Sequence, residues 1–166
     1  SLVCANLAIA LALEGNQTVL LVDLDFRQPR LAHYLGLPPT HGLSDYLAGD
    51  VAFEHILFNP GIEGLVVVPA GTVGLYPTEW AATRRLAELI LEIKTRYESR
   101  ILLFDIPPLS HADAAQLLLP KVDGAVLIVE DGRHSPDELH HAMHLLEGTP
   151  LLGLVLNQTG HQAGLK

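Results

Sequence analysis

Three aliphatic runs of the sequence end in polar residues: Asp23 and Asp25 after the first, Asp105 after the second and Asn157 after the third. Helical segments alternate with these runs, a pattern that indicates a parallel sheet whose strand ends meet at one edge, where ligands bind in open α/β folds. Carboxylates beside a phosphate-binding helix N-terminus suit Mg²⁺-assisted phosphoryl transfer. Any one strand can end in Asp for turn geometry alone, but three such ends in order favour a functional edge.

Ser1 stands at the N-cap position of a long apolar helix, 2–13. In the phosphate-binding loop G-x-x-x-x-G-K-[ST], the last hydroxyl residue both binds Mg²⁺ and begins a helix. We expect Ser1 to be that residue. The glycines, the lysine and the first strand of the fold would then precede the chain, and the chain by itself would be inactive.

Hydrophobic periodicity and turn residues define the elements that would position these groups. Strands are predicted at 18–22, 65–68, 101–104, 124–129 and 151–156, and helices at 2–13, 43–47, 77–97, 112–119 and 136–146. We therefore predict an α/β fold: a mostly parallel sheet with helices on both faces, in one nucleotide-binding domain over 1–166 that is truncated at its N-terminus.

Composition narrows the functional classes. The chain has 166 residues, 49% of them hydrophobic and 17% charged, as expected for strands buried on both faces. A net charge of −9 argues against a non-specific nucleic-acid surface. The lone Cys4 excludes a disulfide framework and is interpreted as a core residue. The apolar run at 2–13 is shorter than the roughly 20 residues that span a bilayer, so we expect a cytoplasmic protein.

His140 and His144 are spaced i,i+4 on the helix predicted at 136–146. That spacing can bind a metal ion. The alternative, a solvated helix face, is favoured at this level because no flanking Cys or carboxylate completes a site in an obvious way.

The motifs together resemble one family. The opening SLVCANLA (1–8) looks like the helix start of the MinD/ParA-type deviant-Walker ATPases, and VLLVDLDFRQP (19–29) is similar to the Walker A′ motif of their bacterial tyrosine kinase branch, the BY-kinases of capsule and exopolysaccharide export. The run GLSDYLAGD (42–50) and the Walker B-like LLFD (102–105) resemble the same branch. The resemblance covers essentially the whole chain.

The resemblance implies ATP and Mg²⁺ as cofactors and assigns roles to the strand-end residues. Ser1 would ligate Mg²⁺, and Asp25 and Asp105 would hold its water shell. Asp23 would accept the proton of an incoming tyrosine hydroxyl. Asn157 would read the adenine edge.

The implied function is ATP-dependent tyrosine (auto)phosphorylation that regulates polysaccharide polymerisation and export. Partners would be the cytosolic tail of a membrane co-polymerase, which would hold the kinase at the inner face of the membrane, and further copies of the chain. Arg27 would contact phosphate or a neighbouring subunit; a solvated turn residue is the alternative.

The sequence departs from the family pattern at several points. Gln28 replaces the second Arg of the A′ motif, Tyr76 replaces an Asn, and Ile106 replaces a small polar residue. The tyrosine cluster that the family autophosphorylates is absent from the end of the chain, GHQAGLK. These departures leave open a MinD/ParA-like partition or positioning ATPase and, if the protein truly begins at Ser1, a non-catalytic scaffold.

Overall fold

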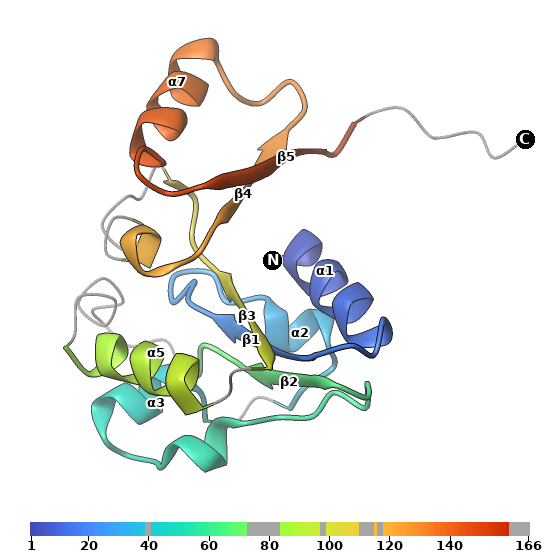
Figure 1. The fold of residues 1–166 in the computed structure, drawn as a ribbon, viewed down its shortest axis with the longest axis vertical. Coiled ribbons are helices and arrows are strands. Elements are labelled where there is room, and N and C mark those ends of the chain that lie inside the picture. Colours follow the sequence, from blue (N-terminus) through green and yellow to red (C-terminus); the bar gives the residue numbers. More distant parts are fainter. Residues whose placement is uncertain (39–40, 73–83, 97–98, 110–114, 116–117, 160–166) are drawn as a thin grey trace, which may run out of the picture. The chain divides into compact units, whose positions relative to one another are not determined.

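The computed structural model describes residues 1–38, 41–72, 84–96, 99–109, 115 and 118–159. Contacts within the chain define two compact units, Ser1–Pro107 and Pro108–Lys166 (Figure 1). Each unit is built from parallel strands and helices. A single domain over 1–166 stays a prediction.

The first unit contains a three-stranded parallel sheet with the order β2-β1-β3. Its strands are β1 (Thr18–Asp23), β2 (Leu65–Val68) and β3 (Arg100–Asp105). After Thr18, every residue of the central strand β1 is buried, as the continuous aliphatic run predicted. The register pairs Asp23 with Asp105, so two acidic residues end neighbouring strands at the same level.

Helix α1 (Leu2–Leu13) packs against this sheet through small side chains. Ala5, Ala8 and Ala12 are buried in one cluster with alternate residues of β1 and β2. Helix α5 (Arg84–Arg96) lies on the opposite side of the sheet in Figure 1. It buries the stripe Leu86, Leu89, Ile90 and Ile93, whose spacing is helical. Both faces of β1 are therefore covered, as predicted.

Three short helices complete the described part of this unit: α2 (Leu31–Tyr34), α3 (Leu43–Ala48) and the 3₁₀ helix η1 (Phe53–Ile56). They lie in the 27–64 segment that separates β1 from β2. The helix predicted at 43–47 is confirmed and is one residue longer.

The second unit contains a parallel pair of strands, β4 (Ala125–Glu130) and β5 (Leu151–Asn157), joined through helix α7 (Pro136–Leu145). A short 3₁₀ helix, η3 (Leu119–Lys121), precedes β4. Ser135 begins α7 with a capping box: its Oγ accepts from the Glu138 N–H at 3.3 Å, and its own N–H donates to Glu138 Oε2 at 2.8 Å.

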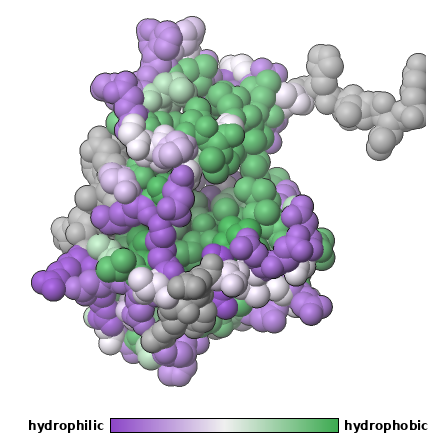
Figure 2. Space-filling view, in the orientation of Figure 1, coloured by the Kyte–Doolittle hydropathy of each residue, from purple (hydrophilic) through white to green (hydrophobic). Residues whose placement is uncertain are grey.

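Apolar side chains reach the surface of the second unit, as Figure 2 shows. On β5, Leu154 is 55% exposed and Leu156 51% exposed, and the register places them on the same face as Leu127 and Val129. On the other face, Val126 is 40% exposed. Parallel strands are usually covered on both faces, so this sheet differs from the buried sheet predicted from composition.

The predicted strands are confirmed with ends shifted by one residue at most, and they form two sheets among the described residues. Ser1 occupies the N-cap of α1 as predicted, and its side chain makes no capping hydrogen bond. Of the helices predicted at 77–97 and 112–119, residues 77–83, 97, 112–114 and 116–117 lie outside the described residues. Within the described part of the chain, no helix is long and apolar enough to cross a membrane.

Candidate active site at the carboxyl edge of the first sheet

The carboxyl ends of β1 and β3 bring Asp23 and Asp105 together. The two residues are register partners on adjacent parallel strands, whose backbones lie about 4.8 Å apart. The N–H of Leu24 donates to the carbonyl oxygen of Asp105 at 2.8 Å, which continues the pairing one residue beyond Asp23. The edge therefore concentrates negative charge at one point, as the order of strand-end carboxylates predicted.

Asp23 is fully enclosed. Its Oδ1 accepts a hydrogen bond from the N–H of Asp25 at 3.0 Å, and its Oδ2 accepts one from the N–H of Leu31, the first residue of α2, at 3.3 Å. Burial, and next the charge of Asp105, raise the pKa of Asp23 to about 7 although both hydrogen bonds oppose the rise. Asp23 thus ties the segment after β1 to the sheet and can exchange a proton near neutral pH.

Asp25 shapes the turn that follows β1. Its Oδ1 accepts from the N–H groups of Arg27 at 3.1 Å and of Gln28 at 3.0 Å. This is the local bonding by which Asp side chains stabilise turns. Asp25 is only half-buried, so its carboxylate is accessible to a ligand at the edge.

Asp105 and Ser1 are neighbours. The backbone nitrogen of Ser1 lies 3.3 Å from Asp105 Oδ1, so the start of α1 meets the end of β3. Asp105 Oδ2 is buried and has no hydrogen-bond partner among the described residues. A buried carboxylate oxygen normally has a partner, and a metal-bound water would supply one here.

These groups fit Mg²⁺, which keeps several waters and is usually held through one or two carboxylates together with substrate phosphates. Ser1, Asp25 and Asp105 supply only oxygen ligands, the type that this ion prefers. Among the described residues, no three His, Cys, Asp or Glu side chains converge as a preformed metal cluster. The donor set therefore suits an ion bound with water and phosphate, and not a metal enclosed by protein.

Two other predicted site residues, Arg27 and Asn157, belong to different units of the chain. Arg27 is exposed on the turn after β1, where its backbone N–H donates to Asp25. Asn157 ends β5 in the second unit, where its carbonyl oxygen accepts from the N–H of Asp131 at 2.9 Å. Their roles toward phosphate and adenine stay predictions.

Cys4 belongs to this region, which the sequence reasoning missed. Burial, followed by the charge of Asp105, raises the pKa of the Cys4 thiol to about 12. The signal was present in the sequence, since Cys4 lies one helical turn after Ser1 and residues three apart share a helix face. The thiol stays protonated at neutral pH.

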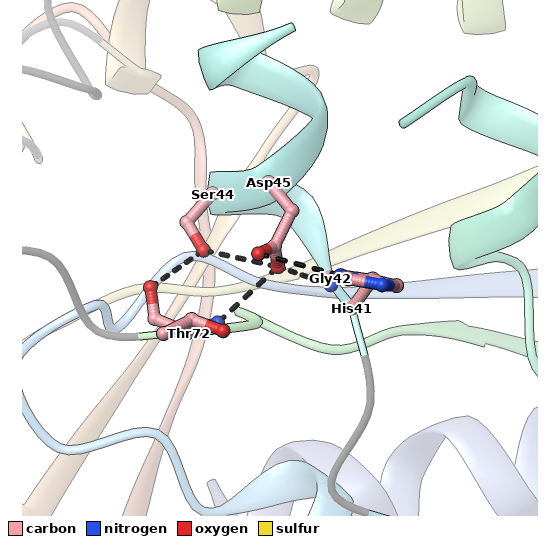
Figure 3. Close-up of polar contacts among 5 residues, drawn as sticks. All are labelled: His41, Gly42, Ser44, Asp45 and Thr72. Atoms are coloured by element: carbon pink, nitrogen blue, oxygen red, sulfur yellow. Dashed lines mark hydrogen bonds and ion pairs between the residues drawn. The ribbon is translucent and has the colours of Figure 1, made fainter. Parts of the chain in front are cut away.

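A carboxylate on α3, Asp45, fixes the loop that follows β2 (Figure 3). Asp45 Oδ2 accepts from the N–H groups of Gly42 at 2.7 Å and Thr72 at 3.3 Å, and Ser44 Oγ donates to the Thr72 carbonyl at 2.8 Å. His41 Nδ1 lies 3.6 Å from Asp45 Oδ1. We refer to these contacts as the Asp45 clasp.

The Asp45 clasp leaves no room for side chains where its two segments meet. A Cβ on Gly42 would overlap the backbone of Pro69 and Gly71, and a Cβ on Gly71 would overlap the Asp45 carboxylate. At the level of sequence, the run 42–50 was recognisable only as a family motif. The position of Asp45, three residues after the N-cap Gly42, was the available signal for its bond to the Gly42 N–H.

Comparison with known proteins shows which proteins this chain resembles in sequence. The chain is 30% identical over 156 residues to the tyrosine-protein kinase CpsD of Streptococcus agalactiae, covering 92% of this chain and 67% of CpsD. It is 31% identical to a putative tyrosine-protein kinase, EpsB of Ralstonia solanacearum, covering 95% of this chain but 21% of EpsB. No family model matches the chain.

Solved structures of similar fold include proteins related to these relatives. The chimerical protein CapA2B2 superposes with a TM-score of 0.84 at 30% identity, covering 94% of this chain and 69% of that one. The septum site-determining protein MinD from Pyrococcus horikoshii, complexed with Mg-ADP, gives a TM-score of 0.73 at 27% identity over 95% of this chain and 64% of MinD. The fold is therefore that of P-loop ATPases and kinases.

Proposed function

This chain belongs to the family of bacterial tyrosine-protein kinases, and on that premise we propose that it carries the nucleotide-binding site of an ATP-dependent tyrosine kinase. By analogy with these relatives, the kinase would regulate the polymerisation and export of capsule or exopolysaccharide. One observation supports the proposal most: Ser1, Asp23 and Asp105 meet at the carboxyl edge of a parallel sheet, and Asp25 follows in the adjoining turn.

Ser1, Asp25 and Asp105 are the residues that would hold Mg²⁺ with the phosphates of ATP. The chemistry supplied by the bound ion is neutralisation of the charge that develops on the transferred phosphoryl group. The protein's contribution is positioning. The Asp105 carboxylate is fixed at the end of β3 beside the start of α1, and Asp25 is fixed by its two turn hydrogen bonds.

Asp23 is the proposed proton acceptor. The tyrosine oxygen would attack the γ-phosphorus, its proton would pass to the Asp23 carboxylate, and ADP would leave. In the metal-free chain, burial raises the pKa of the Asp23 carboxyl above its ordinary value, so Asp23 is a stronger base than an exposed carboxylate. Because Asp23 is fully buried, the segment after β1 that its two backbone hydrogen bonds hold must move to admit the tyrosine hydroxyl.

A nucleotide-driven switch is the second candidate function. The similarity to MinD with Mg-ADP supports it, because the same sheet edge can serve ATP hydrolysis that controls association between copies. In that case water would replace the tyrosine hydroxyl as the nucleophile. Asp25 and Asp105 would keep their roles toward the metal ion.

We further propose a cytoplasmic protein that associates with the inner face of the membrane through the cytosolic tail of a membrane-embedded co-polymerase, and that forms homo-oligomers. Support comes from the names of the relatives, since CpsD is a tyrosine-protein kinase and EpsB is named a putative one. The family resemblance implies these partners. Asn157 would read adenine, and Arg27 would contact phosphate or a neighbouring copy.

The test is ATP-dependent tyrosine phosphorylation by the full-length protein, compared with Asp23→Asn and Asp105→Asn variants and with a matched exposed control, Asp50→Asn. We expect phosphotyrosine in the wild type and in the control, and a loss of at least about 100-fold in both site variants. ATP binding that persists in Asp23→Asn but weakens in Asp105→Asn would separate proton transfer from metal binding.

Other outcomes would redirect the assignment. ATP hydrolysis without phosphotyrosine in the wild type would support the switch. Neither activity would contradict both catalytic proposals and support a scaffold.

A further inference from the structure

Helix α7 of the second unit carries two histidines one helical turn apart on an exposed face. His140 and His144 are both exposed, and neither belongs to the carboxyl edge of the first unit. Residues spaced i,i+4 lie about 6 Å apart on the same side of a helix. This is the spacing at which two imidazoles can bind one metal ion.

One of the two histidines is held by a carboxylate. His144 Nδ1 lies 3.0 Å from Glu147 Oε1. In metal sites, a carboxylate on one ring nitrogen fixes the tautomer and the ring orientation and increases the basicity of the other nitrogen. Glu147 therefore leaves His144 Nε2 available as a ligand.

The helix is a firm support for such a pair. Its first turn is closed by the reciprocal hydrogen bonds of Ser135 and Glu138, and Leu146, directly after the helix, is 5% exposed. Asp137 lies three residues before His140, so an acidic residue flanks each end of the pair and favours a cation electrostatically.

We propose that His140 and His144 form a surface site that binds one divalent transition-metal ion through their Nε2 atoms, with Glu147 orienting His144. Water completes the coordination, because no third His, Cys, Asp or Glu converges with a ligand pair among the described residues. Two imidazoles suit Zn²⁺, Ni²⁺ or Cu²⁺ and disfavour Mg²⁺, which prefers oxygen ligands. The site is therefore chemically distinct from the proposed Mg²⁺ site.

The experiment is calorimetric titration of the full chain with Zn²⁺ in the presence of excess Mg²⁺. His140→Ala and His144→Gln remove one ligand each. His55→Ala is the control, because His55 is also exposed but belongs to the first unit and not to α7. Circular dichroism checks that every variant keeps its helices, and ¹⁵N imidazole spectra report which rings bind.

We expect one saturable Zn²⁺ site in the wild type and in His55→Ala. Affinity should fall at least about tenfold in His140→Ala and His144→Gln, and about tenfold in Glu147→Gln, the loss typical of a group that orients a ligand. Imidazole signals of His140 and His144 should shift on binding. No saturable binding by the wild type, or equal losses in His140→Ala and His55→Ala, would overturn the proposal.

Discussion

Asp23 is a carboxyl group whose ionisation conflicts with its burial. Its pKa lies at about 7, against an ordinary 3.8. Between these values the native state keeps a proton that the unfolded chain has released. The stabilising contribution of the protonated group is therefore complete below the unfolded pKa and is lost as pH rises through the folded one.

We predict that the free energy of unfolding of the metal-free chain falls by about 2 kcal/mol between pH 5 and pH 8 through Asp23 alone. Asp23→Asn should remove this loss, because the amide carries no charge, although it gives up one backbone hydrogen bond at every pH. Urea unfolding at the two pH values measures the difference. The exposed control Asp50→Asn should follow the wild type, and a parallel pH dependence in Asp23→Asn would contradict the assignment.

The sequence predicted which residues meet at this site but not how each is used. Asp23, Asp25 and Asp105 followed from strand ends, because parallel strands align their carboxyl ends. The engagement of Asp25 by the Arg27 and Gln28 N–H groups depends on the backbone path of the turn. So does the bond from Leu31 to Asp23. Those paths are set by tertiary packing, which residue spacing does not record.

At the scale of elements, α3 packs against the loop after β2 only because the two backbones lie very close together at glycine residues. Gly71 has φ of +86°, and a Cβ added to it would overlap Asp45 Oδ2 and lie 2.7 Å from Ser44 Oγ. Gly15 has a similar φ of +71° but nothing within 4 Å of an added Cβ. Alanine at Gly15 would therefore meet backbone strain alone, whereas alanine at Gly71 would meet both backbone strain and steric overlap.

We predict that Gly15→Ala costs about 1 kcal/mol of unfolding free energy, the price of a left-handed conformation for a residue with a Cβ. Gly71→Ala should cost at least about 2 kcal/mol more, because the Asp45 clasp must also open. Chemical denaturation of both variants measures the difference. Equal effects would show that the close approach contributes little.

The charge of Asp45 is the other component of the clasp. Burial alone would raise the pKa of Asp45, but the hydrogen bonds from Gly42 and Thr72 outweigh it and hold the pKa below its ordinary value. The stability that this lowered pKa contributes is present above the ordinary value near 3.8. It is lost as pH falls through the folded pKa.

We predict that Asp45→Asn destabilises the chain at pH 7 and that the difference from wild type narrows as the pH approaches 3. Thermal unfolding across this range measures it, with Asp50→Asn, two residues after α3, as the matched control. A pH-independent difference would assign the effect to shape and not to charge.

The positions of helices and strands along the chain were the most predictable feature of the structure. Helix α1 and strands β1 to β5 were expected from aliphatic runs bounded by glycine and acidic residues, and their ends agree within a residue. Ser1 is likewise the N-cap that its residue type predicted, but its side chain does not bond to the helix N-terminus. A hydroxyl at an N-cap can bond elsewhere, and only its surroundings decide which partner it takes.

At the scale of the whole molecule, composition predicted strands that are covered on both faces. This prediction holds for β1 but not for β4 and β5. β1 is buried after its first residue, since α1 and further apolar groups cover its two sides. β4 and β5 are equally aliphatic, yet Val126 is 40% and Leu154 55% exposed. Burial depends on how many layers surround a strand, which its own residues do not specify.

This exposed apolar surface should make residues 1–166 associate. Isolated two-stranded sheets are marginally stable, and contiguous apolar patches promote association. We predict that the chain binds a hydrophobic dye and sediments with a mass that rises with concentration. Leu154→Lys and Val126→Lys should each reduce both signals with little change in unfolding free energy, because these side chains are already in contact with water.

A buried leucine of the same unit provides the control, because Leu146 is 5% exposed and its replacement by Lys would bury a charge. Leu146→Lys should therefore lower the unfolding midpoint and increase dye binding, the opposite of the surface variants. If the wild type stays monomeric and binds no dye, the apolar face must be covered in solution.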